Sequence, residues 1–74
     1  EAVLASRSPT VEEFINLRRE AGWHVPQPDV VAESLKNTLF AVCVEEDGSF
    51  VGSGRVIGDG ALVYVVEGVI VLPE

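Results

Sequence analysis

A long apolar run near the end of the chain limits what it can fold into. Residues 61–72 read ALVYVVEGVIVL and are followed by Pro73 and Glu74. A strand of this length exposes an apolar edge and surface unless something else covers them. We therefore expect the 74 residues to be a piece of a longer protein, and the absence of any methionine, including an initiator, supports this expectation.

Three β-rich segments follow one another in the second half of the chain. They span residues 39–44, 50–57 and 61–72, and Asp47-Gly48 and Asp59-Gly60 lie between them. Asp-Gly pairs between apolar runs are typical of hairpin turns. The pattern predicts a three-stranded antiparallel meander in which residues 61–72 form the longest strand, with an irregularity near Gly68.

The first half of the chain predicts two helices. Thr10 followed by Glu13 is a capping-box pattern, and Gly22 is a plausible end for the helix that it starts. An apolar stripe at helical spacing runs along this helix: Val11, Phe14, Ile15, Leu17 and Ala21. Residues 23–28, WHVPQP, form a proline-broken loop, after which Asp29 can cap a second helix that extends to about residue 36.

These elements define an α+β fold: two helices, then a three-stranded antiparallel meander, with a possible short strand at residues 2–5. Several of the β segments are apolar on both alternating faces, which predicts a sheet covered on both sides. Two short helices cover only one face. We expect the cover of the other face to come from outside these residues.

Composition excludes several functional classes. The net charge is -7, and Arg18 and Arg19 are the only adjacent basic residues, which argues against a nucleic-acid partner and favours a cationic ligand. The single cysteine, Cys43, cannot form an intramolecular disulfide, as expected in a reducing cytoplasm. The terminal apolar run is shorter than the roughly 20 residues of a membrane helix and contains Glu67, so we expect no membrane partner.

Motifs for metal or nucleophilic chemistry are missing from the sequence. One histidine and one cysteine are too few for a zinc site, so we expect no metal. Neither a Ser-His-Asp set nor a phosphate-binding P-loop can be read. Arg55 lies inside an apolar β segment, where a charge must be paired, and Glu67 or Asp59 can pair with it across the hairpin.

The second half of the chain resembles the centre of the GNAT superfamily of acetyl-CoA-dependent N-acetyltransferases. The resemblance is carried by GSGRVIGDG at residues 52–60 and by the following run, which closes with VIVLPE. In that family the fourth strand ends in a V-x-P-E pattern and leads into a glycine-rich loop, which these 74 residues do not contain. The resemblance implies the N-terminal half of a GNAT domain, with acetyl-CoA as cosubstrate and a primary amine as acceptor.

The resemblance also implies where the cosubstrate binds. A bulge in the family's fourth strand frees backbone groups that receive the acetyl group and the pantetheine arm. Gly68 is the residue here that indicates such a bulge. Matching VIVLPE onto the pattern implies that the Val69 amide faces the thioester carbonyl and that backbone groups of Ile70 and Val71 pair with pantetheine. The alternative is a core strand with a kink.

Four further residues are candidates for the acceptor side. Glu67 can accept a proton from an ammonium group, although the glutamate that serves as base in some GNAT members aligns with Val65 and not with Glu67. Trp23 and His24 lie in the loop that covers the acceptor site in the family. Tyr64 can line the pocket. For each, an ordinary structural role is the alternative: a solvated glutamate, a loop histidine, and Trp23 and Tyr64 in the core.

Two other functions remain open at this level. The chain can be a non-catalytic half-domain that associates with another chain through its last strand, or a small acidic inhibitor or antitoxin-like protein. In the leading interpretation, residues 1–74 are the N-terminal portion of a GNAT domain and are inactive alone. The remaining half, another copy or a different subunit then pairs with the last strand.

Overall fold

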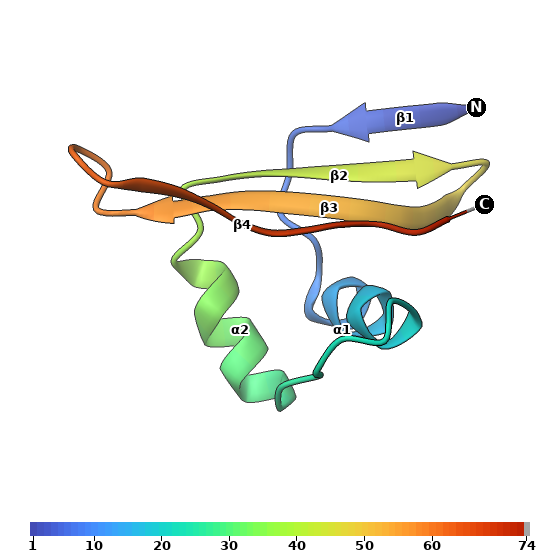
Figure 1. The fold of residues 1–74 in the computed structure, drawn as a ribbon, viewed down its shortest axis with the longest axis horizontal. Coiled ribbons are helices and arrows are strands. Elements are labelled where there is room, and N and C mark those ends of the chain that lie inside the picture. Colours follow the sequence, from blue (N-terminus) through green and yellow to red (C-terminus); the bar gives the residue numbers. More distant parts are fainter. Residues whose placement is uncertain (74) are drawn as a thin grey trace.

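A computed structural model describes residues 1–73 as a single antiparallel sheet with two helices on one of its faces (Figure 1). The strands lie in the order β1-β2-β3-β4, so each strand of the sheet pairs with its neighbour in sequence. The α+β class, the two helices, the meander and the N-terminal strand are confirmed. The elements are β1 (Ala2–Ala5), α1 (Val11–Glu20), α2 (Pro28–Lys36), β2 (Phe40–Glu46), β3 (Ser49–Gly58) and β4 (Tyr64–Val71).

Helix α1 begins with the predicted capping box. The Thr10 hydroxyl accepts a hydrogen bond from the Glu13 amide at 3.1 Å, and the Glu13 carboxylate accepts one from the Thr10 amide at 2.9 Å. Arg7 also donates to Glu13, at 2.8 Å. The helix ends before Gly22, whose φ of 77° lies in the left-handed region that glycine tolerates.

Helix α2 begins differently from the sequence prediction. Its N-cap is Gln27, which makes no side-chain capping bond, and Pro28 occupies the first turn. Proline has no amide hydrogen, and its fixed φ suits the start of a helix. Asp29 therefore lies inside the first turn, and its carboxylate accepts from the amide of Val30 at 2.9 Å. The prediction that Asp29 is the cap was wrong.

The core lies between the helices and the face of the sheet that they cover. Cys43 is fully buried there, and its thiol donates to the carbonyl of Arg7 at 3.3 Å. Burial raises the pKa of the Cys43 thiol, which keeps it neutral and unreactive. The buried apolar residues are Leu17, Val31, Ala41, Cys43 and Ile70.

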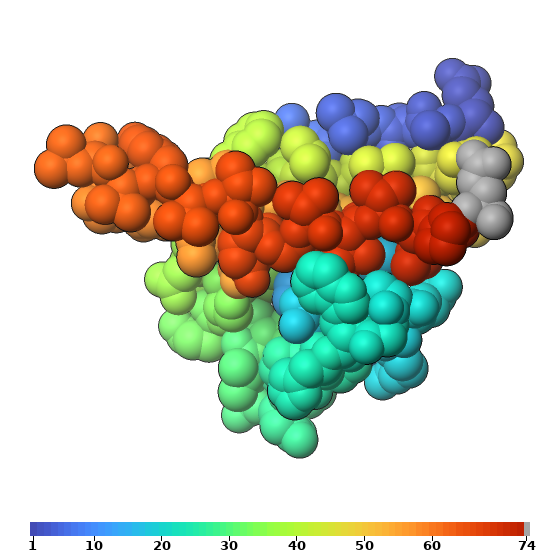
Figure 2. All heavy atoms as spheres, viewed as in Figure 1, coloured from blue at the N-terminus to red at the C-terminus, as the bar shows by residue number. Residues whose placement is uncertain are grey.

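The two hairpin turns differ. Asp47 and Gly48 both have positive φ, 51° and 85°, as expected for a tight two-residue turn. In the second turn the carboxylate of Asp59 accepts hydrogen bonds from the amides of Ala61, Leu62 and Val63 at 2.8–3.0 Å. These bonds fold residues 61–63 into a loop, which projects beyond the helices (Figure 2). Strand β4 is therefore shorter than predicted, and β3, with 10 residues, is the longest.

The face of the sheet opposite the helices is apolar and exposed. Leu4, Phe40, Val66, Val69 and Val71 lie on it, and each is at least half exposed. No element within residues 1–73 covers this face (Figure 1). The expectation that the two helices cover only one face is confirmed.

No helix in the described part of the chain is long and apolar enough to cross a membrane.

Candidate active site

A β-bulge interrupts β4 at Gly68, as predicted. Arg55 pairs with Glu67 and Ser53 pairs with Ile70, so Gly68 and Val69 together lie opposite Gly54. Gly68 has a φ of 65°, which places it in the left-handed region typical of the first residue of a glycine bulge. Gly54 leaves room for Val69, whose Cγ2 lies 3.3 Å from the position that a Cβ at Gly54 would take.

The bulge lies on a free edge, because β4 is the last strand of the sheet. The Leu72 amide donates to the carbonyl of Val51 at 2.8 Å, so the backbone groups of Leu72 point toward β3. Backbone groups alternate in direction along an antiparallel strand, which turns those of Ile70 toward Ser53 and those of Val71 toward the free edge. Of the three residues expected to bind acetyl-CoA, Val69 and Val71 have backbone at the bulged edge, whereas the peptide groups of Ile70 are directed at β3.

Glu67 lies directly before the bulge and forms an ion pair with Arg55. The Arg55 Nε donates to the Glu67 Oε2 at 2.9 Å, and the Glu67 side chain remains 38% exposed. The guanidinium also donates to the carbonyl and hydroxyl of Ser34 and to the hydroxyl of Thr38, at 2.8–3.1 Å. Arg55 therefore joins β3 and β4 to the end of α2 and fixes the Glu67 carboxylate. Of the two partners considered for Arg55, the structure selects Glu67.

Glu67 borders a cleft between α1, α2 and β4. The cleft has a volume of about 140 Å³ and is lined by Arg18, Arg55 and Glu67 among mainly apolar residues of the two helices. A narrower crevice is lined by both Glu67 and Gly68. The carboxylate thus lies between a space that can hold a small molecule and the bulged strand.

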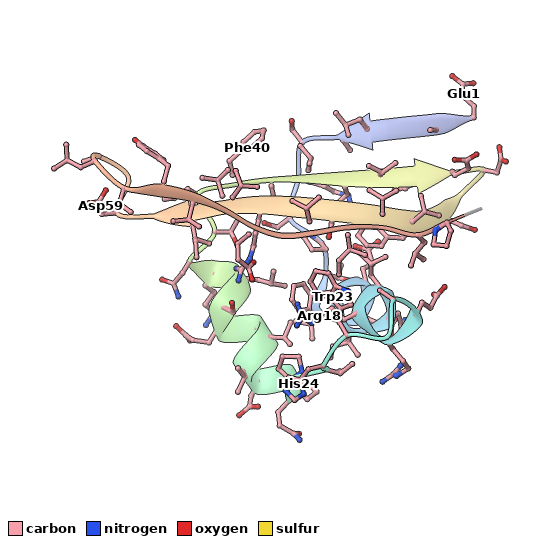
Figure 3. The ribbon with its side chains drawn as sticks, viewed as in Figure 1. Glu1, Arg18, Trp23, His24, Phe40 and Asp59 are labelled. Carbon is pink, nitrogen blue, oxygen red and sulfur yellow. The ribbon has the colours of Figure 1, made fainter. Side chains whose placement is uncertain are left out.

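The aromatic and imidazole candidates do not line this cleft, although Trp23 contacts Arg18, which does. Trp23 stacks on Arg18, with the guanidinium carbon 5.2 Å from the ring centroid, and Figure 3 shows the two side by side. His24 is exposed at the outer end of the loop between the helices, and its backbone carbonyl accepts from the Arg18 Nε at 2.7 Å. Tyr64 is 60% exposed and, by the alternation of side chains, lies on the uncovered face, away from Glu67.

Comparison with solved structures identifies this arrangement. A protein of unknown function from methicillin-resistant Staphylococcus aureus, described as a probable acetyltransferase, superposes with a TM-score of 0.87 and 32% identity. The match covers 97% of this chain and 54% of that protein. A GNAT family acetyltransferase from Streptococcus pneumoniae superposes with a TM-score of 0.82 at 23% identity, over 99% of this chain and 54% of that one. This chain has half of a GNAT fold.

The GNAT match covers only part of each solved protein. The chain spans about half the length of the two solved proteins, so half of each of them has no counterpart in residues 1–74. No protein-family model matches the chain. No curated protein matches it at a significant level. The GNAT assignment therefore rests on the sheet, the two helices and their arrangement in space.

One residue of this GNAT half was not singled out by the sequence. Arg18 appeared only as half of a basic pair, yet it packs between two aromatic rings at the cleft. Phe14 lies one helical turn before Arg18 on α1, a spacing that brings side chains together, but Trp23 comes from the loop after the helix, and no spacing rule links it to Arg18. Among residues 1–73, no group of three or more potential metal ligands is found.

Proposed function

We propose that residues 1–74 are the N-terminal portion of a GNAT acetyltransferase domain, and that the complete protein transfers an acetyl group from acetyl-CoA to a primary amine. The observation that supports this proposal most strongly is the glycine bulge on the free edge of β4, directly after the fixed carboxylate of Glu67. A bulge there leaves backbone groups of Val69 and Val71 available to a ligand. Within this proposal the chain alone is inactive.

The residues at the bulge fit the thioester end of acetyl-CoA. An amide that points out of a sheet edge can donate to a carbonyl oxygen, and the same amide stabilises the negative charge that develops there during acyl transfer. We assign this role to the Val69 amide and pairing with the pantetheine arm to the backbone of Val71. Ile70 has a supporting role only, because its backbone groups are directed at Ser53.

The polyanionic end of the cosubstrate fits this chain poorly. The net charge is -7, so contacts to its phosphates must come from the remaining half of the domain. That half would also pair with β4 and cover the exposed apolar face. A cytoplasmic location accords with this function and with the single buried cysteine.

The chemistry of the site follows from the position of Glu67. Acetyl-CoA supplies an activated acetyl group: the amine nitrogen forms a bond to the carbonyl carbon, the carbon–sulfur bond breaks, and the thiolate takes up a proton. The attacking amine must first lose a proton from its ammonium form. The Glu67 carboxylate attracts the ammonium and accepts that proton, directly or through a water molecule. The ion pair with Arg55 holds the carboxylate in place.

Replacement of Glu67 tests the catalytic role. In the complete protein, Glu67→Gln should lower turnover on the order of 10²-fold and flatten its rise with pH, while acetyl-CoA affinity stays nearly unchanged. Glu12→Gln, on the exposed side of α1, is the matched control and should behave as wild type. Wild-type turnover of Glu67→Gln across the pH range would contradict the catalytic role of Glu67.

A second candidate function has support from the same edge. The unpaired side of β4 adjoins an apolar face, which is the kind of surface that pairs with a strand from another chain. In that case the chain is a non-catalytic half-domain that assembles through β4. Acetyl-CoA titration of the complete protein separates the two: a catalytic domain binds it, and an assembly module does not.

A further inference from the structure

Arg18 is held in a fixed position beside the cleft. Its guanidinium carbon lies 5.3 Å from the ring centroid of Phe14 and 5.2 Å from that of Trp23, and its Nε donates to the His24 carbonyl at 2.7 Å. Two aromatic rings and one hydrogen bond leave the guanidinium little freedom to rotate. The side chain is thus ordered before any ligand binds.

The two terminal nitrogens of this ordered group have no hydrogen-bond acceptor within residues 1–73. The other arginines near the sheet differ, since Arg7 donates to Glu13 and Glu45 and Arg55 donates to Glu67, Ser34 and Thr38. No carboxylate of the described chain forms an ion pair with Arg18. A planar guanidinium with two free nitrogens is suited to bind a carboxylate or a phosphate through paired hydrogen bonds.

The charge of the cleft is opposite to that of the chain. Arg18, Arg55 and Glu67 line it, so its formal charge is positive although the chain carries -7. Arg55 is occupied by Glu67, which leaves the Arg18 head as the cationic group free to bind and the second oxygen of Glu67 as the anionic one. A ligand with only positive charges would be attracted by Glu67 and repelled by Arg18.

We infer that the acceptor amine of this site also carries a carboxylate or another anionic group, which Arg18 binds while Glu67 receives the ammonium. This inference rests on the proposed function, because it names the substrate class of the same site. The acceptor is then a zwitterion of the amino-acid type. A polyamine, which the acidic composition alone favours, does not fit the charges of the cleft.

Binding of matched small molecules to the complete protein tests this inference without acetyl-CoA. The probes are glycine, leucine, β-alanine and 4-aminobutyrate, each compared with its amide, which keeps the ammonium and loses the carboxylate. We expect at least one amino acid to bind more tightly than its amide, by about 10- to 100-fold, the range for hydrogen bonds to a charged group. Equal or weaker binding of every amino acid relative to its amide would overturn the inference.

Variants connect the preference to Arg18. Arg18→Gln should remove the difference between an amino acid and its amide, and Arg18→Lys should retain part of it, since the charge stays and the paired geometry is lost. Arg19→Gln is the control, because Arg19 is exposed and donates to Asn16. A preference that survives in a folded Arg18→Gln protein would overturn the assignment. If that variant does not fold, the wild-type comparison and Arg18→Lys decide.

The outcomes separate this inference from the proposed function. Selective binding of an amino acid without any acetyl transfer in the presence of acetyl-CoA would contradict the proposed function and leave the charge recognition standing. Acetyl transfer to simple amines and amino amides as efficient as transfer to amino acids would contradict only the recognition by Arg18.

Discussion

Replacement of Gly68 by alanine is the most direct test of the bulge. A Cβ at this position would meet no atom within 4 Å, so the change introduces no steric clash. The cost comes from the backbone, because an L-residue in the left-handed region is less stable by roughly 1–2 kcal/mol. Alanine also restricts the unfolded chain, which offsets about 0.4–1 kcal/mol of that cost. The net loss of stability should be about 1 kcal/mol.

Gly22 provides a matched control. Its φ is 77°, a Cβ there would also meet no atom within 4 Å, and it lies after the end of α1, outside the sheet. Gly22→Ala should therefore lower stability by a similar amount. In urea unfolding, each variant should shift the midpoint by about 1 M if the slope is about 1 kcal/mol/M, at the low end for small proteins.

The two variants should differ in ligand binding. In Gly68→Ala, the positive φ makes the bulged form of β4 less favourable relative to a regular strand. A free-energy cost of about 1.4 kcal/mol lowers the population of the form that binds acetyl-CoA by up to about tenfold. Acetyl-CoA affinity of the complete protein, measured by calorimetry, should fall by up to that factor for Gly68→Ala and stay unchanged for Gly22→Ala. Equal affinity in the two variants, at equal loss of stability, would refute the role of the bulge.

Two further predictions concern the polar contacts. Arg55→Met should lower the free energy of unfolding by about 2–3 kcal/mol, because it removes four hydrogen bonds of a largely buried guanidinium. Glu67→Gln should lower it by less than about 1 kcal/mol, because the oxygen of the new amide still accepts a hydrogen bond from Arg55. Equal losses in urea unfolding would contradict this order. Hydrogen bonds from Arg7 and Thr10 lower the pKa of Glu13, and backbone amides lower the pKa of Asp59. The ordinary pKa is 4.5 for Glu13 and 3.8 for Asp59. Each carboxylate contributes its full stability at pH values above its ordinary pKa. This stability is lost as the pH falls through the lower pKa of the folded state. Glu13→Gln and Asp59→Asn should each flatten the loss of stability below about pH 4.5, and an unchanged pH profile in both would contradict the assignment.

Much of the fold could be predicted because its signals are local. Thr10 and Glu13 are three residues apart, Asp47 and Gly48 are adjacent, and Gly68 is the one glycine in an apolar run. The length of β4 could not be predicted in the same way. Residues 61–63 are apolar and continue the run that predicts a strand, but the Asp59 carboxylate accepts hydrogen bonds from all three of their amides. The hydrogen bonds of one side chain thus override the apolar pattern.

The candidate site also has one part that the sequence predicts and one part that it does not. The pairing of Arg55 with Glu67 was within reach of the sequence, because the hairpin register places them opposite each other. Arg18 was not: its contact with Phe14 follows from helical spacing, but its place at the cleft also depends on Trp23 in the loop and on how the helices lie relative to β4. Such contacts depend on the angles between elements, which no local pattern specifies.

The strand order has a consequence for how the chain folds. Strands β2, β3 and β4 are joined by short turns, so their pairing closes small loops and can form early and fast. Strand β1 pairs with β2 across both helices, with Ala5 opposite Cys43, and this pairing must close a much longer loop. We therefore expect the hairpins to fold first and β1 to join last, locking the helices onto the sheet as it does so. Native-state hydrogen exchange should accordingly show the amides of β1 opening before those of β3.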